Sequence, residues 1–446
     1  MDGGKLKSYS IILAVIGVLT FVGIKGLKAW NARITPEKIA AGKALFERQW
    51  TVGDELCGQG DGLGPVFNAN SCVACHFQGG IGGSSGNDVN VTAFDVIYEF
   101  DDMSARSGVV HANAVSSAQR ESRQDVNLMF PVETREVTIL EGGGMYGPEC
   151  KPSPLRETTV VESHDPVFFH ELNSPALFGV GLIDQISNVS VSLHGHKRLA
   201  RKLTEEMSGD FGGNRLGMIN MVDGQVGKFG WKGQFSSLED FVASACAMEI
   251  GLSNSIHWQP VAKEYRADDQ AKLDMTPKQL HELVCFVRNL PRPQQVIPDE
   301  PAMLERVNRG EALFVSAGCA DCHVRDFAGI PQIYSDFHLY NLEPVKMITS
   351  SGGYSDGKAE EEFDFDRSIP HPDQWQTPAL WGVADSAPYF HDGGSPTLRS
   401  AIERHKGQAN SSLQRFESLS THDQKCLLQF LKTLKAPVNA LVDEAK

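Results

Sequence analysis

Two pentapeptides of the form Cys-x-x-Cys-His contain residue types and a spacing that metal or redox chemistry needs. Their members are Cys72, Cys75 and His76 in the first copy and Cys319, Cys322 and His323 in the second. Such a motif is compatible with a zinc site, a redox-active dithiol or the covalent attachment of haem. The three alternatives make different demands on the rest of the sequence.

A structural zinc ion needs four ligands close together, and neither motif has a second pair of cysteines or histidines near it in sequence. A thioredoxin-like dithiol lies in a βαβ pattern, which this sequence lacks. In c-type haem attachment, the two thiols bond to the vinyl groups of the porphyrin and the adjacent histidine becomes the proximal iron ligand. The sequence therefore predicts two covalently bound haem c groups.

Helical segments stand before and after each motif. The segments EKIAAGKALFERQW at 37–50 and GEALFVSAGCADCH at 310–323 lead into the two motifs. Each half then closes with an apolar-periodic segment, at 276–293 and at 420–437, which opens at Ser or Thr and stops at proline. The pattern predicts that a pair of helices frames each haem site.

An internal repeat links the two halves. NSPALFGVGLI at 173–183 matches QTPALWGVADS at 376–386, and SLEDFVASA matches TLRSAIERH. The alignment places Trp231 opposite His391, Leu238 opposite Leu398 and Ala245 opposite His405. The haem domains are therefore interpreted as duplicated, with a long insertion of loops and short strands in the first.

The predicted fold is mainly α, with two cytochrome c-like haem domains preceded by an N-terminal membrane helix. The proline-rich stretch PRPQQVIPDEP marks the boundary between the domains. The predicted units are a signal anchor at 1–34, haem domain 1 with its insertion at 35–293, a linker at 294–300, haem domain 2 at 301–437 and a tail at 438–446.

Residues 11–24 carry no charge and would span roughly 21 Å as a helix, less than a bilayer core of about 30 Å. This length is typical of a cleaved secretion signal, but no small-x-small cleavage site follows. Tyr9 and Lys25 could extend the span by lying at the two interfaces. We therefore expect an uncleaved anchor in the inner membrane and a periplasmic or otherwise extracytoplasmic location, with a cleaved signal as the alternative.

Charge and cysteine content restrict partners and redox state. The net charge of −15 argues against nucleic acid as a partner, because phosphate binding needs a basic surface. Five of the nine cysteines lie outside the two motifs. For an exported protein we expect one or two disulfides and one free thiol among them. These cysteines are Cys57, Cys150, Cys246, Cys285 and Cys426.

The passages TPALWGV, APYFHDG and PTLRSAIERH, together with the two haem motifs, resemble the bacterial di-haem cytochrome c peroxidase superfamily. The closest branch is that of the di-haem oxidoreductases, also called thiol oxidoreductases, and the likeness covers residues 36–437. It implies that one haem takes electrons from a donor cytochrome or another small redox protein, while the other reduces a small-molecule oxidant, usually hydrogen peroxide. A thiol substrate has no physical support, because every cysteine pair of redox spacing belongs to a haem motif.

The resemblance implies roles for two residues of the first half. Trp231 in FGWKGQ matches a tryptophan that lies between the haems, although a core tryptophan is equally compatible with the pattern. Glu249 in CAMEIG matches a glutamate above the peroxide-binding iron, where a carboxyl with a raised pKa could move a proton; the alternative is a solvated helix-end residue. The glutamine that usually precedes this glutamate is missing, since the aligned position is near Phe241.

The resemblance also implies axial ligands opposite the proximal histidines. His405 matches the second ligand of haem 2, with Met347 as the weaker alternative. His164 and His170 both lie near the place of a displaceable ligand of haem 1, and the sequence does not choose between them. His391 is expected to contact a propionate or the other domain rather than iron. Calcium at the domain interface is implied as well, but no EF-hand-like loop is present.

We therefore predict that electrons enter at haem 2, cross near Trp231 and reduce peroxide at haem 1. Two alternatives remain open. One is a pure electron-transfer cytochrome, in which protein ligands close both irons. The other is long-range oxidation of a partner protein, which the lack of a tyrosine at 400–410 disfavours.

Overall fold

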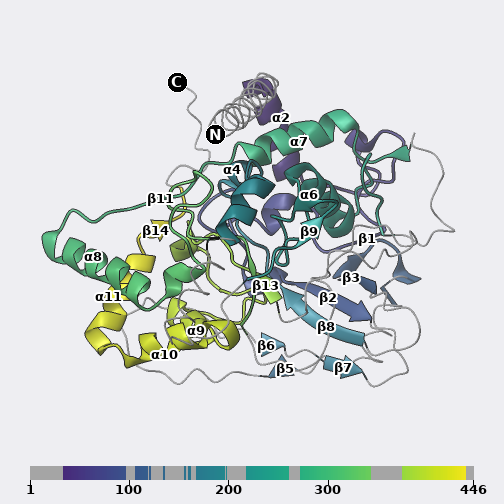
Figure 1. Cartoon of the computed structure of the whole chain (residues 1–446). Coiled ribbons are helices and arrows are strands. Elements are labelled where there is room, and N and C mark those ends of the chain that lie inside the picture. Colours follow the sequence, from purple (N-terminus) through teal and green to yellow (C-terminus); the bar gives the residue numbers. More distant parts are fainter. Residues whose placement is uncertain are drawn as a thin grey trace, which may run out of the picture.

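The computed structural model describes most of both predicted halves (Figure 1). The described residues are 34–96, 106–118, 120–121, 134–135, 155–156, 159–161, 167–195, 197, 217–260, 272–342 and 374–437. The predicted anchor at 1–34 lies outside this set except for its last residue. Within these ranges, no helix is long and apolar enough to cross a membrane.

A pair of crossed helices frames each half. In the first half, α2 (Pro36–Glu47) packs against α7 (Pro277–Arg288); in the second, α8 (Pro301–Ser316) packs against α11 (Thr421–Leu431). The four predicted helical segments are thereby confirmed. Three of them begin within one residue of the prediction, whereas α8 begins nine residues before the predicted 310–323 and ends at Ser316. In Figure 1 the first pair and the second pair lie on different sides of the molecule.

The two helix pairs cross at equivalent glycines. A Cβ atom at Gly42 would lie 2.0 Å from the carbonyl oxygen of Glu282, and one at Gly310 would lie 2.0 Å from that of Cys426. Only glycine permits this approach of two helix backbones. The sequences GKALF and GEALF therefore specify the same crossing twice.

Side-chain caps explain where these helices begin. Thr35, Thr276 and Ser420 each accept a hydrogen bond from a backbone N–H of the first turn, and α2 and α7 have proline in that turn. Thr276 also forms a reciprocal capping box with Gln279. Shorter helices follow the same rule, with Ser237 capping α6 and Thr397 capping α9.

Other helical elements complete the two halves. The α-helices are α4 (Val180–Ile183), α6 (Leu238–Ala245), α9 (Leu398–Glu403) and α10 (Asn410–Ser418). A π-helical turn, η4 (Cys246–Ile250), continues α6 directly. The short 3₁₀ turns are η1 (Glu55–Cys57), η2 (Cys72–Ala74), η3 (Asn87–Val89), η7 (Cys319–Asp321), η8 (Val383–Asp385) and η9 (Gly407–Ala409).

The insertion of the first half contains an antiparallel sheet with strand order β3-β2-β8-β7. Its strands are β2 (Val91–Val96), β3 (Arg106–Val110), β7 (Thr159–Val161) and β8 (Val167–Leu172). Ala93 pairs with Val109 on one side and with His170 on the other. Short strands were predicted in this region, but their assembly into one sheet was not, because the pairing joins segments far apart in the chain.

The remaining strands form two-stranded ribbons. They are β1 (Val66–Phe67) with β4 (Asn113–Ala114), β5 (Thr134–Arg135) with β6 (Leu155–Arg156), β9 (Met221–Val222) with β10 (Gln225–Val226), β11 (Gln294–Gln295) with β14 (Leu434–Lys435), and β12 (Leu339–Asn341) with β13 (Gln374–Gln376). The fold is mostly helical with some strands. Because β11 lies in the predicted linker and pairs with β14, the linker is held against the second half.

Two apolar cores correspond in the main to the two halves. The larger core includes Phe46, Leu283 and Phe286, and it extends to Phe327 and Trp381 from the second half. The smaller core lies around α8 and α11 and includes Val307, Phe314, Leu427 and Phe430. The boundaries of the predicted domains themselves remain a prediction.

The expectation of disulfides is wrong for the four described cysteines outside the motifs. Cys57, Cys246, Cys285 and Cys426 are buried and carry no disulfide, and Cys150 lies outside the described residues. The thiols of Cys285 and Cys426 instead contact His281 and His422 one helical turn earlier, each at 3.5 Å. Buried cysteines of this kind act as small apolar residues.

Candidate functional site

Both Cys-x-x-Cys-His motifs adopt the same turn. The N–H groups of Cys75 and His76 donate to the carbonyl oxygen of Cys72 at 3.2 and 3.1 Å. In the second motif, the N–H groups of Cys322 and His323 donate to Cys319 at 3.4 and 3.0 Å. The turns follow α2 and α8, so equivalent helices present the two motifs.

Each motif histidine is held by a backbone carbonyl. His76 Nδ1 donates to the carbonyl oxygen of Gly83 at 3.1 Å, and His323 Nδ1 donates to that of Tyr334 at 3.0 Å. Burial lowers the pKa of each imidazole to about 4, which keeps both rings neutral. A neutral ring with its Nδ1 proton engaged leaves Nε2 as the ligand atom, as an axial iron ligand requires.

Aromatic packing around these histidines is also duplicated. The ring centroids of Phe46 and His76 are 6.3 Å apart, and those of Phe314 and His323 are 6.3 Å apart. Each phenylalanine stands four residues after the crossing glycine of its helix. The short phrase that sets the helix crossing therefore also places the apolar wall beside the histidine.

In the second half, the imidazole of His405 faces that of His323. The ring centroids are 6.4 Å apart with an interplanar angle of 57°. Two imidazoles that bind one metal ion from opposite sides have ring centroids roughly 6.4 Å apart, because each metal–nitrogen bond is about 2.0 Å and each nitrogen lies about 1.2 Å from its ring centre. His405 Nδ1 donates to the carbonyl oxygen of Ala401 at 2.8 Å, which again leaves Nε2 as the ligand atom. The pair fits one haem iron between them.

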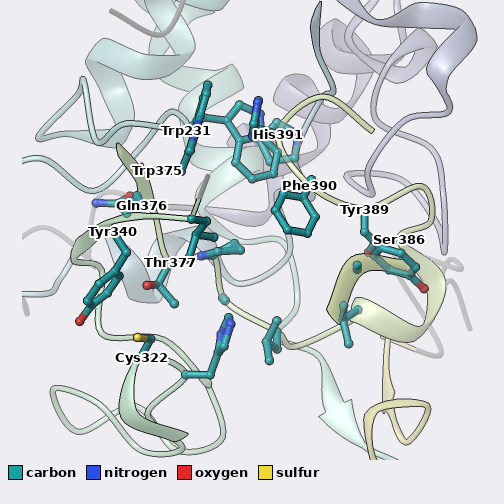
Figure 2. Close-up of a pocket in the computed structure, with 18 of the residues that line it drawn as sticks. Trp231, Cys322, Tyr340, Trp375, Gln376, Thr377, Ser386, Tyr389, Phe390 and His391 are labelled. Carbon is teal, nitrogen blue, oxygen red and sulfur yellow. The ribbon is translucent and has the colours of Figure 1, made fainter. Parts of the chain in front are cut away.

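A cavity of about 330 Å³ contains the second motif and continues to the interface with the first half (Figure 2). Its wall is largely apolar and includes Phe314, Leu398, Ile402, Leu413 and Leu427. An apolar slot with two convergent imidazoles has the chemistry of a haem pocket. In Figure 2, Cys322 lies at one end of the cavity and Trp231, Trp375 and His391 lie at the other.

The first half has no imidazole at the position that corresponds to His405. The alignment places Ala245 there, at the last residue of α6. The helix then widens into the π-turn η4, which carries Glu249. Local π-turns often occur at functional sites because they redirect side chains out of the helical register.

Glu249 lies close to the first motif. Its Oε2 atom accepts a hydrogen bond of 2.6 Å from Asn68 Nδ2, and its backbone carbonyl accepts from Asn68 N at 2.8 Å. Burial raises the pKa of the Cys75 thiol to about 12, and the charge of Glu249 adds to this shift. The carboxylate is therefore near enough to Cys75 to act on it electrostatically.

Trp231 lies at the interface of the two halves. Its Nε1–H donates to the carbonyl oxygen of Asn173 at 2.8 Å, and the N–H of Asn173 donates to the carbonyl oxygen of His391 at 2.6 Å. The ring of His391 stacks on Trp375 with centroids 3.4 Å apart and planes 7° apart. His391 thus makes the interdomain contact expected of it, and Trp375 is a member of the site that the sequence did not indicate.

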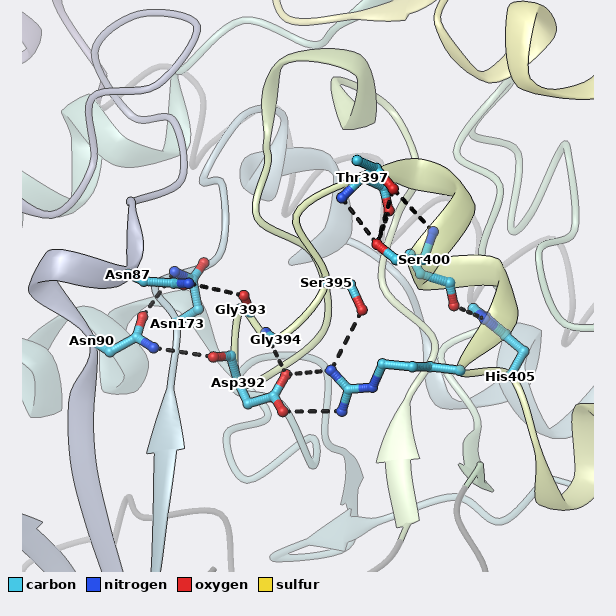
Figure 3. Close-up of polar contacts among 12 residues, drawn as sticks. Asn87, Asn90, Asn173, Asp392, Gly393, Gly394, Ser395, Thr397, Ser400 and His405 are labelled. Carbon is cyan, nitrogen blue, oxygen red and sulfur yellow. Dashed lines mark hydrogen bonds and ion pairs between the residues drawn. The ribbon is translucent and has the colours of Figure 1, made fainter. Parts of the chain in front are cut away.

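A network of amides and charges joins the same interface (Figure 3). Asn87 Nδ2 and Asn90 Nδ2 each donate at 3.0 Å, to the carbonyl oxygens of Gly393 and Asp392 respectively. Arg404 binds both carboxylate oxygens of Asp392, at 2.9 and 3.0 Å. Burial alone would raise the pKa of Asp392, but the interactions with His391 and with the hydrogen-bonded guanidinium of Arg404 lower it overall. Because Arg404 precedes His405, this ion pair links the interface to the turn that carries His405.

Several predicted ligands cannot be compared with the structure. His164 and Met347 lie outside the described residues, and of His170 only the backbone, in β8, is described. In the described part of the chain, no cluster of three or more His, Cys, Asp or Glu side chains is arranged to hold a metal ion. The calcium prediction therefore has no acidic cluster to support it among these residues.

Comparisons with known proteins identify the family of the chain. Residues 174–434 match the sequence model of the family described as "Di-haem oxidoreductase", whose suggested activity is that of a peroxidase. The chain is 22% identical over 178 residues to hydrazine synthase subunit gamma from Kuenenia stuttgartiensis, covering 36% of this chain and 50% of that protein. It is 26% identical over 136 residues to cytochrome c551 peroxidase from Nitrosomonas europaea, covering 30% and 36% respectively. The chain thus spans half or less of these curated relatives.

Two solved structures share 20% sequence identity with the chain. One is hydrazine synthase from Kuenenia stuttgartiensis, with a TM-score of 0.25 over 36% of this chain and 57% of that one. The other is a MauG-like protein associated with microbial copper homeostasis, with a TM-score of 0.27 over 40% and 61%. The family match covers more than half of the sequence and both sides of the second haem pocket. The chain belongs to the di-haem oxidoreductase family of the di-haem cytochrome c superfamily.

Proposed function

We propose that the protein reduces hydrogen peroxide at the haem site of the first half and receives electrons through the haem site of the second half. Bound haem supplies redox-active iron, and an iron with an open axial position can take a small ligand. The observation that carries the proposal is the difference between the halves: His405 lies across from His323, whereas Ala245 stands at the corresponding position of the first half.

The residues of the second half favour electron transfer over ligand binding. His323 and His405 are half-buried with lowered pKa values, and both Nδ1 protons are engaged by backbone carbonyls. Two such imidazoles would occupy both axial positions of an iron and exclude water from it.

The residues of the first half favour chemistry on a small oxidant. An alanine methyl group cannot coordinate iron, so Ala245 does not supply the axial ligand that we assign to His405 in the second half. Glu249 is held by Asn68 through both its side chain and its backbone carbonyl. We assign to a Glu249 carboxylate oxygen the transfer of a proton between the two oxygens of peroxide. This is the usual role of a general acid–base group.

The test is peroxide turnover by the holoprotein with a reduced small cytochrome as donor. Glu249→Gln should lower the rate by about 10²–10⁴-fold, the usual contribution of a positioned proton-transfer group, and should leave haem content unchanged. Glu239→Gln, an exposed carboxylate on α6, is the matched control and should keep the wild-type rate. An undiminished rate in Glu249→Gln would exclude this role.

Partners and location are proposed on the same basis. The donor is a small redox protein, and Trp231 is the side chain that we assign to the path between the halves. The segment at 11–24 anchors the protein to the inner membrane, with the haem domains on the extracytoplasmic side. Calcium at the domain interface would need oxygen ligands, and the buried Asn87 Oδ1, which has no hydrogen-bond donor in the described structure, is a candidate.

A further inference from the structure

Tyr340 in the wall of the second haem pocket is paired with the buried Asp336 behind it. Tyr340 is 2% exposed and Asp336 is fully buried. The Tyr340 hydroxyl donates to Asp336 Oδ2 at 2.6 Å. Tyr340 lines the same cavity as Cys322 and His323, and Figure 2 shows its ring beside Gln376 and Thr377. A phenol with its proton directed at a carboxylate thus borders the pocket.

The surroundings of Asp336 stabilise a proton acceptor. Its Oδ1 atom accepts from the N–H of His338 at 3.0 Å. Nδ1 of His338 and Nε2 of His194 lie 3.6 and 4.0 Å from Oδ2. These polar groups face the carboxylate and offset part of the cost of its burial.

Aromatic side chains connect Tyr340 with the interface of the halves. Tyr340 stands directly opposite Trp375 in the register of β12 and β13. Trp375 stacks on His391, whose ring meets Trp231 edge-on with centroids 6.5 Å apart. Directly opposed residues of an antiparallel pair have Cβ atoms about 4.5–5.5 Å apart. The side chains of Tyr340, Trp375, His391 and Trp231 therefore form a continuous aromatic row.

The charges along this row distinguish its members. The ammonium of Lys232, which is 1% exposed, lies 4.6 Å from the centroid of Trp375. Loss of an electron from Trp375 would put two positive charges face to face in a buried site, which is unfavourable. Tyr340 can release its proton to Asp336 as the electron leaves, so no positive charge is created. Tyr340 is therefore the easier of the two to oxidise.

We propose that Tyr340 is a redox-active tyrosine that supplies an electron when the external donor is exhausted, with Asp336 as the acceptor of its proton. This rests on the proposed reduction of peroxide. Conversion of one hydrogen peroxide to two water molecules consumes two electrons and two solvent protons. Without donor, Tyr340 would supply one of these electrons, and bound haem would supply the other. The O–H bond of Tyr340 breaks, the proton bonds to Asp336 Oδ2, and a neutral phenoxyl radical remains. A later donor electron and the returning proton restore both side chains.

The test is electron paramagnetic resonance of fully oxidised holoprotein that is mixed with hydrogen peroxide and frozen within milliseconds. A neutral tyrosyl radical is expected, and its spectrum should narrow when tyrosine is supplied with deuterated β-carbons. Tyr340→Phe should abolish it, whereas Tyr389→Phe, at another tyrosine of the same cavity, should leave it intact. Asp336→Asn should lower the yield about tenfold or more, because a carboxamide does not accept the proton. Lys232→Met should move part of the signal to Trp375.

A second oxidant separates this proposal from the peroxide proposal. Photogenerated ruthenium(III) tris-bipyridine with persulfate oxidises aromatic residues without peroxide chemistry at haem. If peroxide is not turned over but this oxidant gives the Tyr340 radical, the peroxide function fails and Tyr340 stands. If peroxide is turned over with donor, but neither oxidant gives a radical that Tyr340→Phe removes, the assignment of Tyr340 is overturned. The assignment of Tyr340 is also overturned if peroxide is not turned over and neither oxidant gives the radical.

Discussion

Replacement of His405 by alanine tests the closed second haem most sharply. The spacing of 6.4 Å between the His323 and His405 rings leaves room for one iron and nothing else. With a bond of about 2.0 Å and about 3.5 Å across the imidazole, the alanine Cβ would stand roughly 5.5 Å from that iron. One small ligand fits in this gap. Thioether bonds at Cys319 and Cys322 would keep the haem in place without its second axial ligand.

The assay is carbon monoxide binding to the reduced holoprotein, with the spin state of the oxidised protein measured in parallel. His405→Ala should raise the stoichiometry from one to two carbon monoxide molecules per protein, and added imidazole should restore the low-spin spectrum. His422→Ala, at an exposed histidine on α11, is the control and should behave as wild type. His405→Met should stay low-spin with a raised reduction potential, since methionine–histidine ligation has that effect. A His405→Ala spectrum identical to wild type would refute the assignment of this ligand.

Three other expectations follow from the same geometry. Ala245→His should close the first haem, abolish carbon monoxide binding and stop peroxide turnover, while an Ala245→Ser control should change neither. Gly42→Ala and Gly310→Ala would each place a Cβ atom 2.0 Å from a carbonyl oxygen. Each should lower the free energy of unfolding by about 1–3 kcal/mol, as thermal melts would measure, whereas the control Ala41→Ser should not. Burial lowers the pKa of His391 from 6.5 to about 4. Between these pH values the unfolded state binds a proton that the folded state does not, so the stability present above pH 6.5 is lost as the pH falls towards 4. His391→Phe should therefore flatten the dependence of the melting temperature on pH over that window, and an unchanged slope would contradict the burial.

The sequence allowed prediction of the features that are repeated. Two haem motifs, the phrases GKALF and GEALF, and the matched capping residues each specify local structure, and each is present twice. The resemblance of PTLRSAIERH to the family also indicated His405 as the candidate second ligand of haem 2, a role that stays a prediction. In the structure, the ring centroid of His405 lies 6.4 Å from that of His323.

Features that depend on long-range pairing were not predictable. Trp375 reaches His391 only because β13 pairs with β12 across a long intervening segment. The carbonyl partners of the motif histidines, Gly83 and Tyr334, make their contacts through backbone atoms, which no residue type reveals. The disulfide expectation failed because counting cysteines says nothing about whether two Cβ atoms approach within about 4 Å. Tyr340 and Asp336 stand four residues apart in an irregular segment, so no periodic pattern joined them.

The central claim is that one haem iron is closed by the protein and the other is open. A carbon monoxide titration of fully reduced wild-type holoprotein, with the haem content counted in the same sample, tests it most directly. One carbon monoxide for every two haems is the predicted result. Binding of none, or of one to each haem, would contradict the difference between His405 and Ala245 on which the proposed function depends.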